Sequence, residues 1–103
     1  MLAAIDRIVR YVDELPLDAF IQDDQAVDAV IRNFIVIGEA AGHVPDEVAQ
    51  RHSEVPWATI RGMRNAAVHD YVNISLQTIW NTSRDDLPLL RSQLQALLDD
   101  KLA

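Results

Sequence analysis

The sequence has no cysteine, which excludes a disulfide framework and a thiolate metal site. It also has no long hydrophobic run, since apolar stretches such as Phe34–Ile37 are far too short to cross a membrane. The first seven residues lack the basic region and the apolar core of a signal peptide. From these absences we expect a protein of the reducing cytoplasm with no membrane segment.

Glycine and proline are also scarce, with three glycines and four prolines in 103 residues. Half of the residues are apolar, which is enough for one modest hydrophobic core. The length therefore predicts a single domain over residues 1–103. A helical domain of this size often gains stability by burying a face against a second copy of itself.

The few prolines and glycines divide the chain into helical segments. Apolar spacing predicts a helix over residues 1–14, a second from about Asp24 to Gly42 and a third over about residues 57–71. Pro45 can open a short segment between the last two. A final long helix begins near Ser75, and Pro88 should kink or break it. No segment has the period of a strand, so the prediction is an all-α, up-and-down four-helix bundle with a kinked C-terminal helix.

Three residues near the end of the second helix interrupt or border its apolar face. Gly38 lies inside the stripe of apolar residues along one face of this helix. Glycine there lowers helix stability by roughly 1 kcal/mol relative to alanine, and we expect the compensating gain to be close approach of a neighbouring helix. Glu39 lies at the edge of the stripe, where it either orients an arginine or is a solvated carboxylate. His43 follows the helix end, where a cation favours the terminal carbonyls, so we expect a structural role.

Positive charge is scarce and unevenly distributed. The formal net charge is -7, whereas domains that bind duplex nucleic acid are usually basic. Residues 1–50 contribute -7 and residues 71–103 contribute -1, but residues 51–70 contribute +1. A local basic patch in that middle segment can bind one phosphate group, but it should not hold long nucleic acid tightly.

The predicted helix over residues 57–71 separates its side chains into two faces at 100° per residue. The apolar side chains fall on one side, which should face the core: Ile60, Met63, Ala66 and Ala67. The polar side chains share the other side, with Tyr71 at its edge: Arg61, Arg64, Asn65 and His69.

These residue types suit phosphoryl chemistry on RNA. His69 titrates near neutrality, so it can take the proton of a ribose 2′-hydroxyl or give one to the leaving oxygen. Arg64 offers a fixed fork of donors to a phosphate, and Asn65 can orient either group. Arg64 and His69 are about 140° apart around a regular helix. They can meet at one phosphate if the helix ends near His69, or if a two-fold partner brings its own pair to the same groove.

A solvated helix face explains the same polar residues, because an Arg-x4-His pair alone is a weak motif. The tyrosine two residues after the histidine makes the pattern more specific. The three histidines show no metal-ligand spacing, so we predict no metal site.

The run Arg64–Tyr71 resembles the R-x4-H-x-Y signature of HepT-type proteins of the HEPN superfamily, with the asparagine after the arginine included. Other parts agree with the same family: Ile37-Gly38-Glu39-Ala40, Val55-Pro56-Trp57, Gly62-Met63, Trp80 and Leu87-Pro88. The resemblance covers nearly the whole chain. It departs at the start, where family members usually have another turn or two before the segment that begins here at Met1.

The resemblance implies an all-helical homodimer whose paired motifs form a metal-independent endoribonuclease site with no cofactor. Arg64 and His69 would be catalytic, supported by Asn65, Arg61 and Glu39. It further implies a toxin of a type VII-like pair, with RNA as substrate. The MntA-type nucleotidyltransferase antitoxin of such a pair transfers AMP from ATP to the motif tyrosine, here Tyr71.

Two other classes of function remain open at this stage. One is a non-catalytic HEPN module that binds a nucleotidyltransferase, and the other is a plain dimeric structural bundle. Growth arrest on expression of the chain alone would favour the toxin over both.

Overall fold

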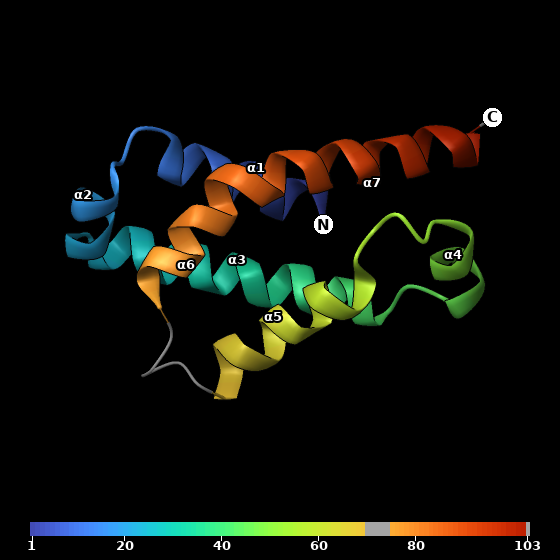
Figure 1. Cartoon of the computed structure of the whole chain (residues 1–103), viewed down its shortest axis with the longest axis horizontal. Helices are drawn as coiled ribbons and strands as arrows, with labels where there is room; N and C mark the ends of the chain where they lie inside the picture. Colours follow the sequence, from blue (N-terminus) through green and yellow to red (C-terminus); the bar gives the residue numbers. More distant parts are fainter. Residues whose placement is uncertain (70–74, 103) are drawn as a thin grey trace.

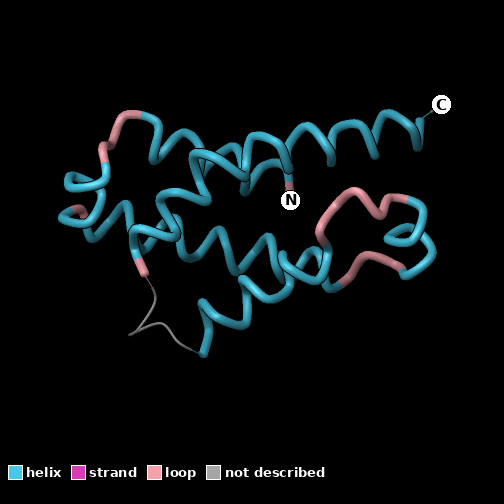
Figure 2. The backbone as a smooth tube through the Cα atoms, in the orientation of Figure 1, coloured by secondary structure: helices cyan, strands magenta, loops and turns pink. Residues whose placement is uncertain are grey.

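A computed structural model describes residues 1–69 and 75–102 of the chain. Its long helices are α1 (Leu2–Asp13), α3 (Asp24–Gly42), α5 (Trp57–His69) and α7 (Leu87–Leu102). The short elements are α2 (Leu17–Gln22), α4 (Asp46–Arg51), α6 (Leu76–Asn81) and the π-helical segment η2 (Thr82–Asp86), which joins α6 to α7. Among these residues there is no strand (Figure 2).

Successive long helices run in opposite directions, so the chain forms an up-and-down bundle (Figure 1). The central helix is α3, which packs against both α1 and α5, and α1 also packs against α7. The predicted all-α architecture is therefore confirmed over the described residues. Within the same residues, no helix combines the length and the hydrophobicity that crossing a bilayer requires.

The core lies where the sequence pattern predicts it. The predicted stripe of α3 is buried, and so are most apolar positions of α1 and of the C-terminal helix: Ile5, Ile8, Val12, Val27, Val30, Ile31, Phe34, Ala41, Ile79, Leu87, Leu90, Leu94 and Leu97. Trp57 is buried, and its indole Nε1 donates to the His52 carbonyl at 3.1 Å. Trp80 is half-buried, and its Nε1 donates to the Leu15 carbonyl at 2.9 Å, which ties α6 to the end of α1.

The helix ends show how short polar residues set the boundaries. The Asp23 carboxylate accepts from the Ala26 N–H at 3.0 Å and caps α3, while the Ser75 hydroxyl oxygen accepts from the Thr78 N–H at 3.2 Å and caps α6. Gly42 is the last residue of α3, as predicted. None of the described glycines has a positive φ, so Gly42 ends the helix without the left-handed geometry common at that position.

The C-terminal helix accommodates its proline through a π turn. The Leu87 N–H donates to the Thr82 carbonyl, five residues earlier, and the buried Ser83 hydroxyl donates to the Ile79 carbonyl at 2.7 Å. Pro88 has no N–H for the carbonyl four residues before it, so the regular α pattern cannot continue through this point. The helix widens and bends there, and α6 and α7 follow different directions in Figure 1.

The sequence pattern did not predict α2. This helix has six residues, begins directly after Pro16 and buries Phe20 completely. It is too short for apolar periodicity to reveal it, although proline just before a helix and Asp18 in its first turn are typical of a helix start.

Candidate functional site

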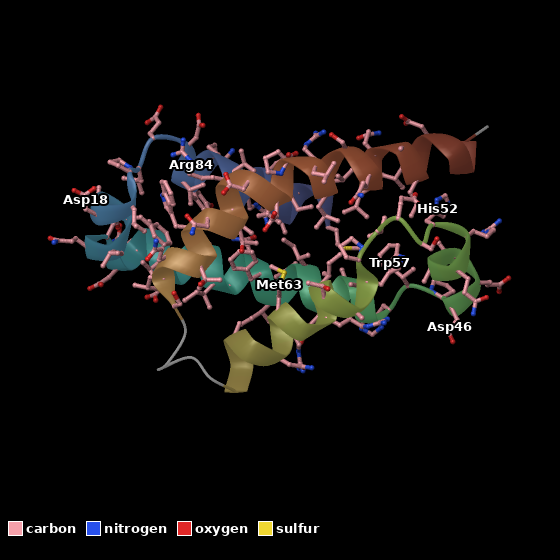
Figure 3. All side chains as sticks on the ribbon, viewed as in Figure 1. Asp18, Asp46, His52, Trp57, Met63 and Arg84 are labelled. Atoms are coloured by element: carbon pink, nitrogen blue, oxygen red, sulfur yellow. The ribbon has the colours of Figure 1, made fainter. Side chains whose placement is uncertain are left out.

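The motif helix α5 presents the two faces that the sequence predicts. Ile60 and Ala67 are buried, and Met63 is half-buried and extends toward the centre of the molecule in Figure 3. Arg61 and Asn65 are exposed on the opposite side. The apolar side packs against α3, so the polar side chains are held at the edge of the α3–α5 contact.

The two helices meet most closely at Gly38 and Arg64. A Cβ atom placed on Gly38 would overlap the Cβ of Arg64 and would stand 3.1 Å from its Cα. Any side chain at position 38 would therefore push α5 away from α3. This contact confirms the close approach that glycine in the stripe predicted, and it identifies the neighbour as the motif arginine.

The guanidinium of Arg64 is held by two neighbours. Its Nη1 donates to Asn65 Oδ1 at 3.1 Å, and its Nη2 lies 3.5 Å from Glu39 Oε1. The Nε atom is shielded from solvent and has no acceptor among the described residues. The Arg64 side chain is 36% exposed. Its base is thus anchored between the helices, while the guanidinium end reaches the surface, where Asn65 and Glu39 contact it.

These groups line a groove of about 410 Å³ between α3 and α5. Its lining brings together four of the predicted site residues and three others: Glu39, Arg61, Arg64 and Asn65, with Gly38, Gly42 and His43. The two guanidinium groups outnumber the single carboxylate, so the groove is locally positive in an acidic chain. A groove of this charge suits a phosphate group.

His43 also lines this groove, although its position in the sequence predicts only a structural role. Its backbone N–H caps the end of α3, as its position predicts, but its exposed imidazole lines the groove instead of bonding the helix carbonyls. The signal was present in the sequence, because Glu39 and His43 are four residues apart and therefore share one face of α3.

The remaining predicted site residues lie at or beyond the end of the described motif helix. His69 is the last described residue of α5, and its side chain lies outside the described part. Tyr71 falls within residues 70–74, which the structure does not describe. The structure therefore places Arg64, Asn65, Arg61 and Glu39 together and leaves the positions of the other two side chains as predictions.

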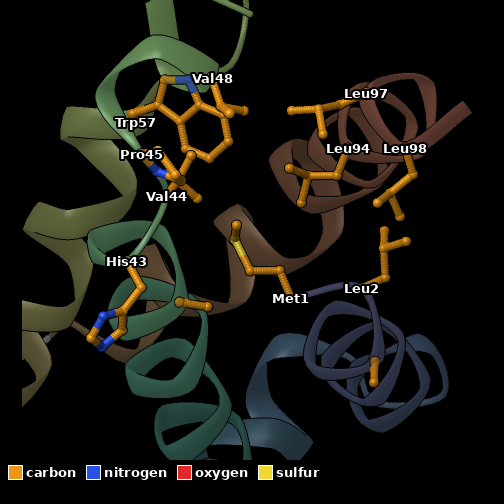
Figure 4. A pocket seen from close by; sticks show the side chains of 12 residues that line it. Met1, Leu2, His43, Val44, Pro45, Val48, Trp57, Leu94, Leu97 and Leu98 are labelled. Atoms are coloured by element: carbon orange, nitrogen blue, oxygen red, sulfur yellow. The ribbon is translucent and has the colours of Figure 1, made fainter. Parts of the chain in front are cut away.

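A second hollow, of about 510 Å³, lies at the end of the bundle between the start of α1, the end of α3 and α7. Figure 4 shows that its walls are apolar, with Met1, Trp57 and Leu94 facing one another. His43 stands at its rim with the ring turned away from these side chains. His43 thus lines both the polar groove and the rim of this apolar hollow.

We also searched the described residues for a metal site. They contain no group of three or more histidine, cysteine, aspartate or glutamate side chains placed to hold a metal ion.

Comparison with known proteins identifies the family of the chain. The model of a family described as "Ribonuclease HepT-like" matches residues 1–97. A protein of Caldanaerobacter subterraneus subsp. tengcongensis named "Putative RNase TTE0752" is 31% identical over 95% of this chain and 88% of its own length. One of Thermococcus cleftensis named "Probable ribonuclease HepT" is 31% identical over 91% of this chain and 86% of its own. No solved structure matches the chain significantly. With a family match over nearly its whole length, the chain belongs to the HepT-like ribonuclease family.

Proposed function

We propose that this chain is a metal-independent endoribonuclease toxin that cleaves RNA in the cytoplasm. The observation that carries the proposal is the Arg64 guanidinium, oriented by Glu39 and Asn65 at a positive groove. Arg64 stands five residues before His69 on the same helix. An arginine held in this way supplies a phosphate clamp, and a histidine on the same helix supplies an acid–base group.

The reaction uses the 2′-hydroxyl of the RNA as the nucleophile. His69 takes its proton, the O2′ forms a bond to phosphorus, and the bond from phosphorus to O5′ breaks. Arg64 binds the phosphate oxygens as negative charge builds on them. The products are a 2′,3′-cyclic phosphate and a 5′-hydroxyl end. A second His69 from a two-fold partner is available to protonate the leaving O5′.

The scheme requires a homodimer, because the Arg64 and His69 of one helix cannot easily reach the same phosphate. Apolar surface for such a dimer lies beside the motif helix, in a groove of about 420 Å³ between α5 and α7. Leu89, on its edge, is 63% exposed. Light scattering at micromolar concentration should give a dimer, and Leu89→Asp should weaken it. A monomer at that concentration would contradict the composite site.

Regulation completes the proposal. A nucleotidyltransferase antitoxin of the MntA type opposes the toxin by AMPylating Tyr71. The tyrosine oxygen attacks the α-phosphorus of ATP, pyrophosphate leaves, and the phenolic proton passes to solvent. ATP is thus used by the partner and not by this chain. A bulky anionic group near Arg64 would compete with the RNA phosphate for that arginine.

The proposal is tested by incubating the purified chain with RNA in the presence of EDTA. Cleavage that leaves 2′,3′-cyclic phosphate ends is the expected result. Cleavage that EDTA abolishes would contradict the metal-free mechanism. RNA that stays intact, together with no growth arrest on expression of the chain alone, would favour the non-catalytic HEPN module that binds a nucleotidyltransferase.

A further inference from the structure

The groove between α3 and α5 has a second cationic position, one helical turn away from Arg64. The contact between Gly38 and Arg64 fixes how the two helices are aligned, and they run in opposite directions (Figure 1). One turn further along α3 is Gly42, followed by His43, and one turn back along α5 is Arg61. His43 and Arg61 therefore lie at the same end of the groove, displaced from the level of the Gly38–Arg64 contact by about 7.5 Å along α3 and about 4.5 Å along α5.

This second position differs from the first in its bonding. The guanidinium of Arg64 is already paired with Glu39 and Asn65. Arg61 and His43 are both exposed, and neither side chain has a hydrogen bond or an ion pair with any other described residue. The His43 ring turns away from the apolar hollow beside it (Figure 4). Their donors are thus available to a ligand that enters the groove.

We propose that Arg61 and His43 form a second phosphate subsite, which binds the RNA phosphate next to the one held by Arg64. This inference rests on the proposed function, because it assigns the neighbouring part of the same RNA strand. A guanidinium fork and an imidazole N–H are donors that suit a phosphodiester. The offset of one helical turn is of the order of the spacing between successive phosphates in an extended strand. The subsite binds and positions the strand, and it takes no part in proton transfer.

The test compares a dinucleoside monophosphate, which has only the scissile phosphate, with an RNA of five nucleotides. For Arg61→Gln and His43→Gln we expect the KM of the longer RNA to rise about tenfold. The kcat/KM of the dinucleotide should stay the same in His43→Gln, and in Arg61→Gln it should fall by less than that of the longer RNA. Arg51→Gln is the matched control, because it removes an exposed positive charge of the same segment that does not line the groove.

A second readout does not depend on cleavage. Binding of a five-nucleotide RNA blocked by 2′-O-methyl groups should weaken in both variants. In Arg61→Gln, which removes a fixed positive charge, the salt dependence should lose a slope of about 0.7 for the one phosphate contact removed. Equal effects on the dinucleotide and the longer RNA would overturn the subsite, and so would variants indistinguishable from Arg51→Gln.

The outcomes separate the two proposals. If the wild-type chain cleaves RNA and the variants cleave the longer RNA equally well, only the subsite is wrong. If the wild-type chain binds the blocked RNA through Arg61 and His43 but cleaves nothing, the ribonuclease proposal fails and the subsite stands. A chain that neither binds nor cleaves RNA would overturn both.

Discussion

Gly38 of α3 lies against the backbone and Cβ of Arg64 on α5, so close that no side chain fits between the two helices. In the bundle, α5 makes its main contact with α3. The position of the motif arginine is therefore set by the absence of a side chain on the neighbouring helix. The same contact thus joins a residue that packs the helices, Gly38, to a residue of the candidate site, Arg64.

The first prediction concerns Gly38→Ala. The new methyl group must displace α5, so the free energy of unfolding should fall by about 1–3 kcal/mol, as in other overpacked cores. Cleavage should fall as well, because Arg64 moves relative to Glu39. Urea unfolding and RNA cleavage measure the two effects.

Gly42→Ala and Gly62→Ala are the matched controls. Both glycines are helical, and a Cβ on either meets no atom within 4 Å. Each substitution should stabilise the protein by about 0.5–1 kcal/mol, the usual advantage of alanine over glycine in a helix. If Gly38→Ala were as stable as these two, the close contact would not constrain α5.

The second prediction separates orientation from charge at Glu39. Glu39→Gln keeps the shape of the side chain but removes the negative charge beside Arg64. We expect RNA to bind more tightly and kcat to fall by less than about tenfold, since an exposed ion pair is worth roughly 0.2–1 kcal/mol. Steady-state kinetics give both values. If kcat and KM were both unchanged, Glu39 would be a solvated carboxylate with no influence on the arginine.

The third prediction concerns acid stability. Arg91 Nε donates to Asp6 Oδ1 at 2.6 Å and joins α7 to α1. This hydrogen bond lowers the pKa of Asp6 below its ordinary value of 3.8. The pair therefore stabilises the fold above that value, and its contribution is lost as the pH falls through the lowered pKa.

Arg91→Gln should accordingly be less stable than the wild type at about pH 7, and the difference should shrink as the pH falls through the lowered pKa of Asp6. Urea unfolding over a series of pH values measures it. Arg51→Gln removes a charge without this partner, so its difference from the wild type should not follow the titration of Asp6. A constant difference for Arg91→Gln would show that the pair does not act through ionised Asp6.

How far the sequence predicts this molecule depends on the range of each interaction. Periodicity and capping residues act within a few residues, and they predicted α1, α3 and α5 and the start of the final helix near Ser75. The π turn before Pro88 depends on how the helix accommodates a missing N–H, and the sequence predicted only a kink or break. The six-residue α2 has too few positions to show a period.

The site follows the same division. The sequence predicted the polar face of α5, because its residues all lie on one helix and follow its periodicity. That Glu39 reaches Arg64, and that His43 enters the same groove, depends on the alignment of α3 with α5. Gly38 indicated a close approach but did not identify the opposite residue. For a site formed between two helices, the sequence therefore predicts which residues each helix contributes, but not which of them meet.

The fourth prediction tests regulation through Tyr71. Tyrosine is protonated at neutral pH, with an ordinary pKa near 10, so the acid–base step does not need its hydroxyl. Tyr71→Phe should keep much of its toxicity but escape neutralisation by a modifying nucleotidyltransferase. Intact mass spectrometry after incubation with that partner and ATP reports the modification. AMP on another residue, or on none, would remove Tyr71 from the regulatory site.

The most direct test of the central claim is the rate of RNA cleavage by Arg64→Ala and His69→Ala, measured in EDTA beside the wild type. Arg64→Ala keeps the Cβ that packs against Gly38, so its fold should survive, and circular dichroism should confirm unchanged helicity for both variants. We predict that each loses about 10²–10⁴ in rate, the usual contribution of a positioned acid–base group or phosphate clamp. Folded variants that cleave RNA as fast as the wild type would contradict the assignment of this site.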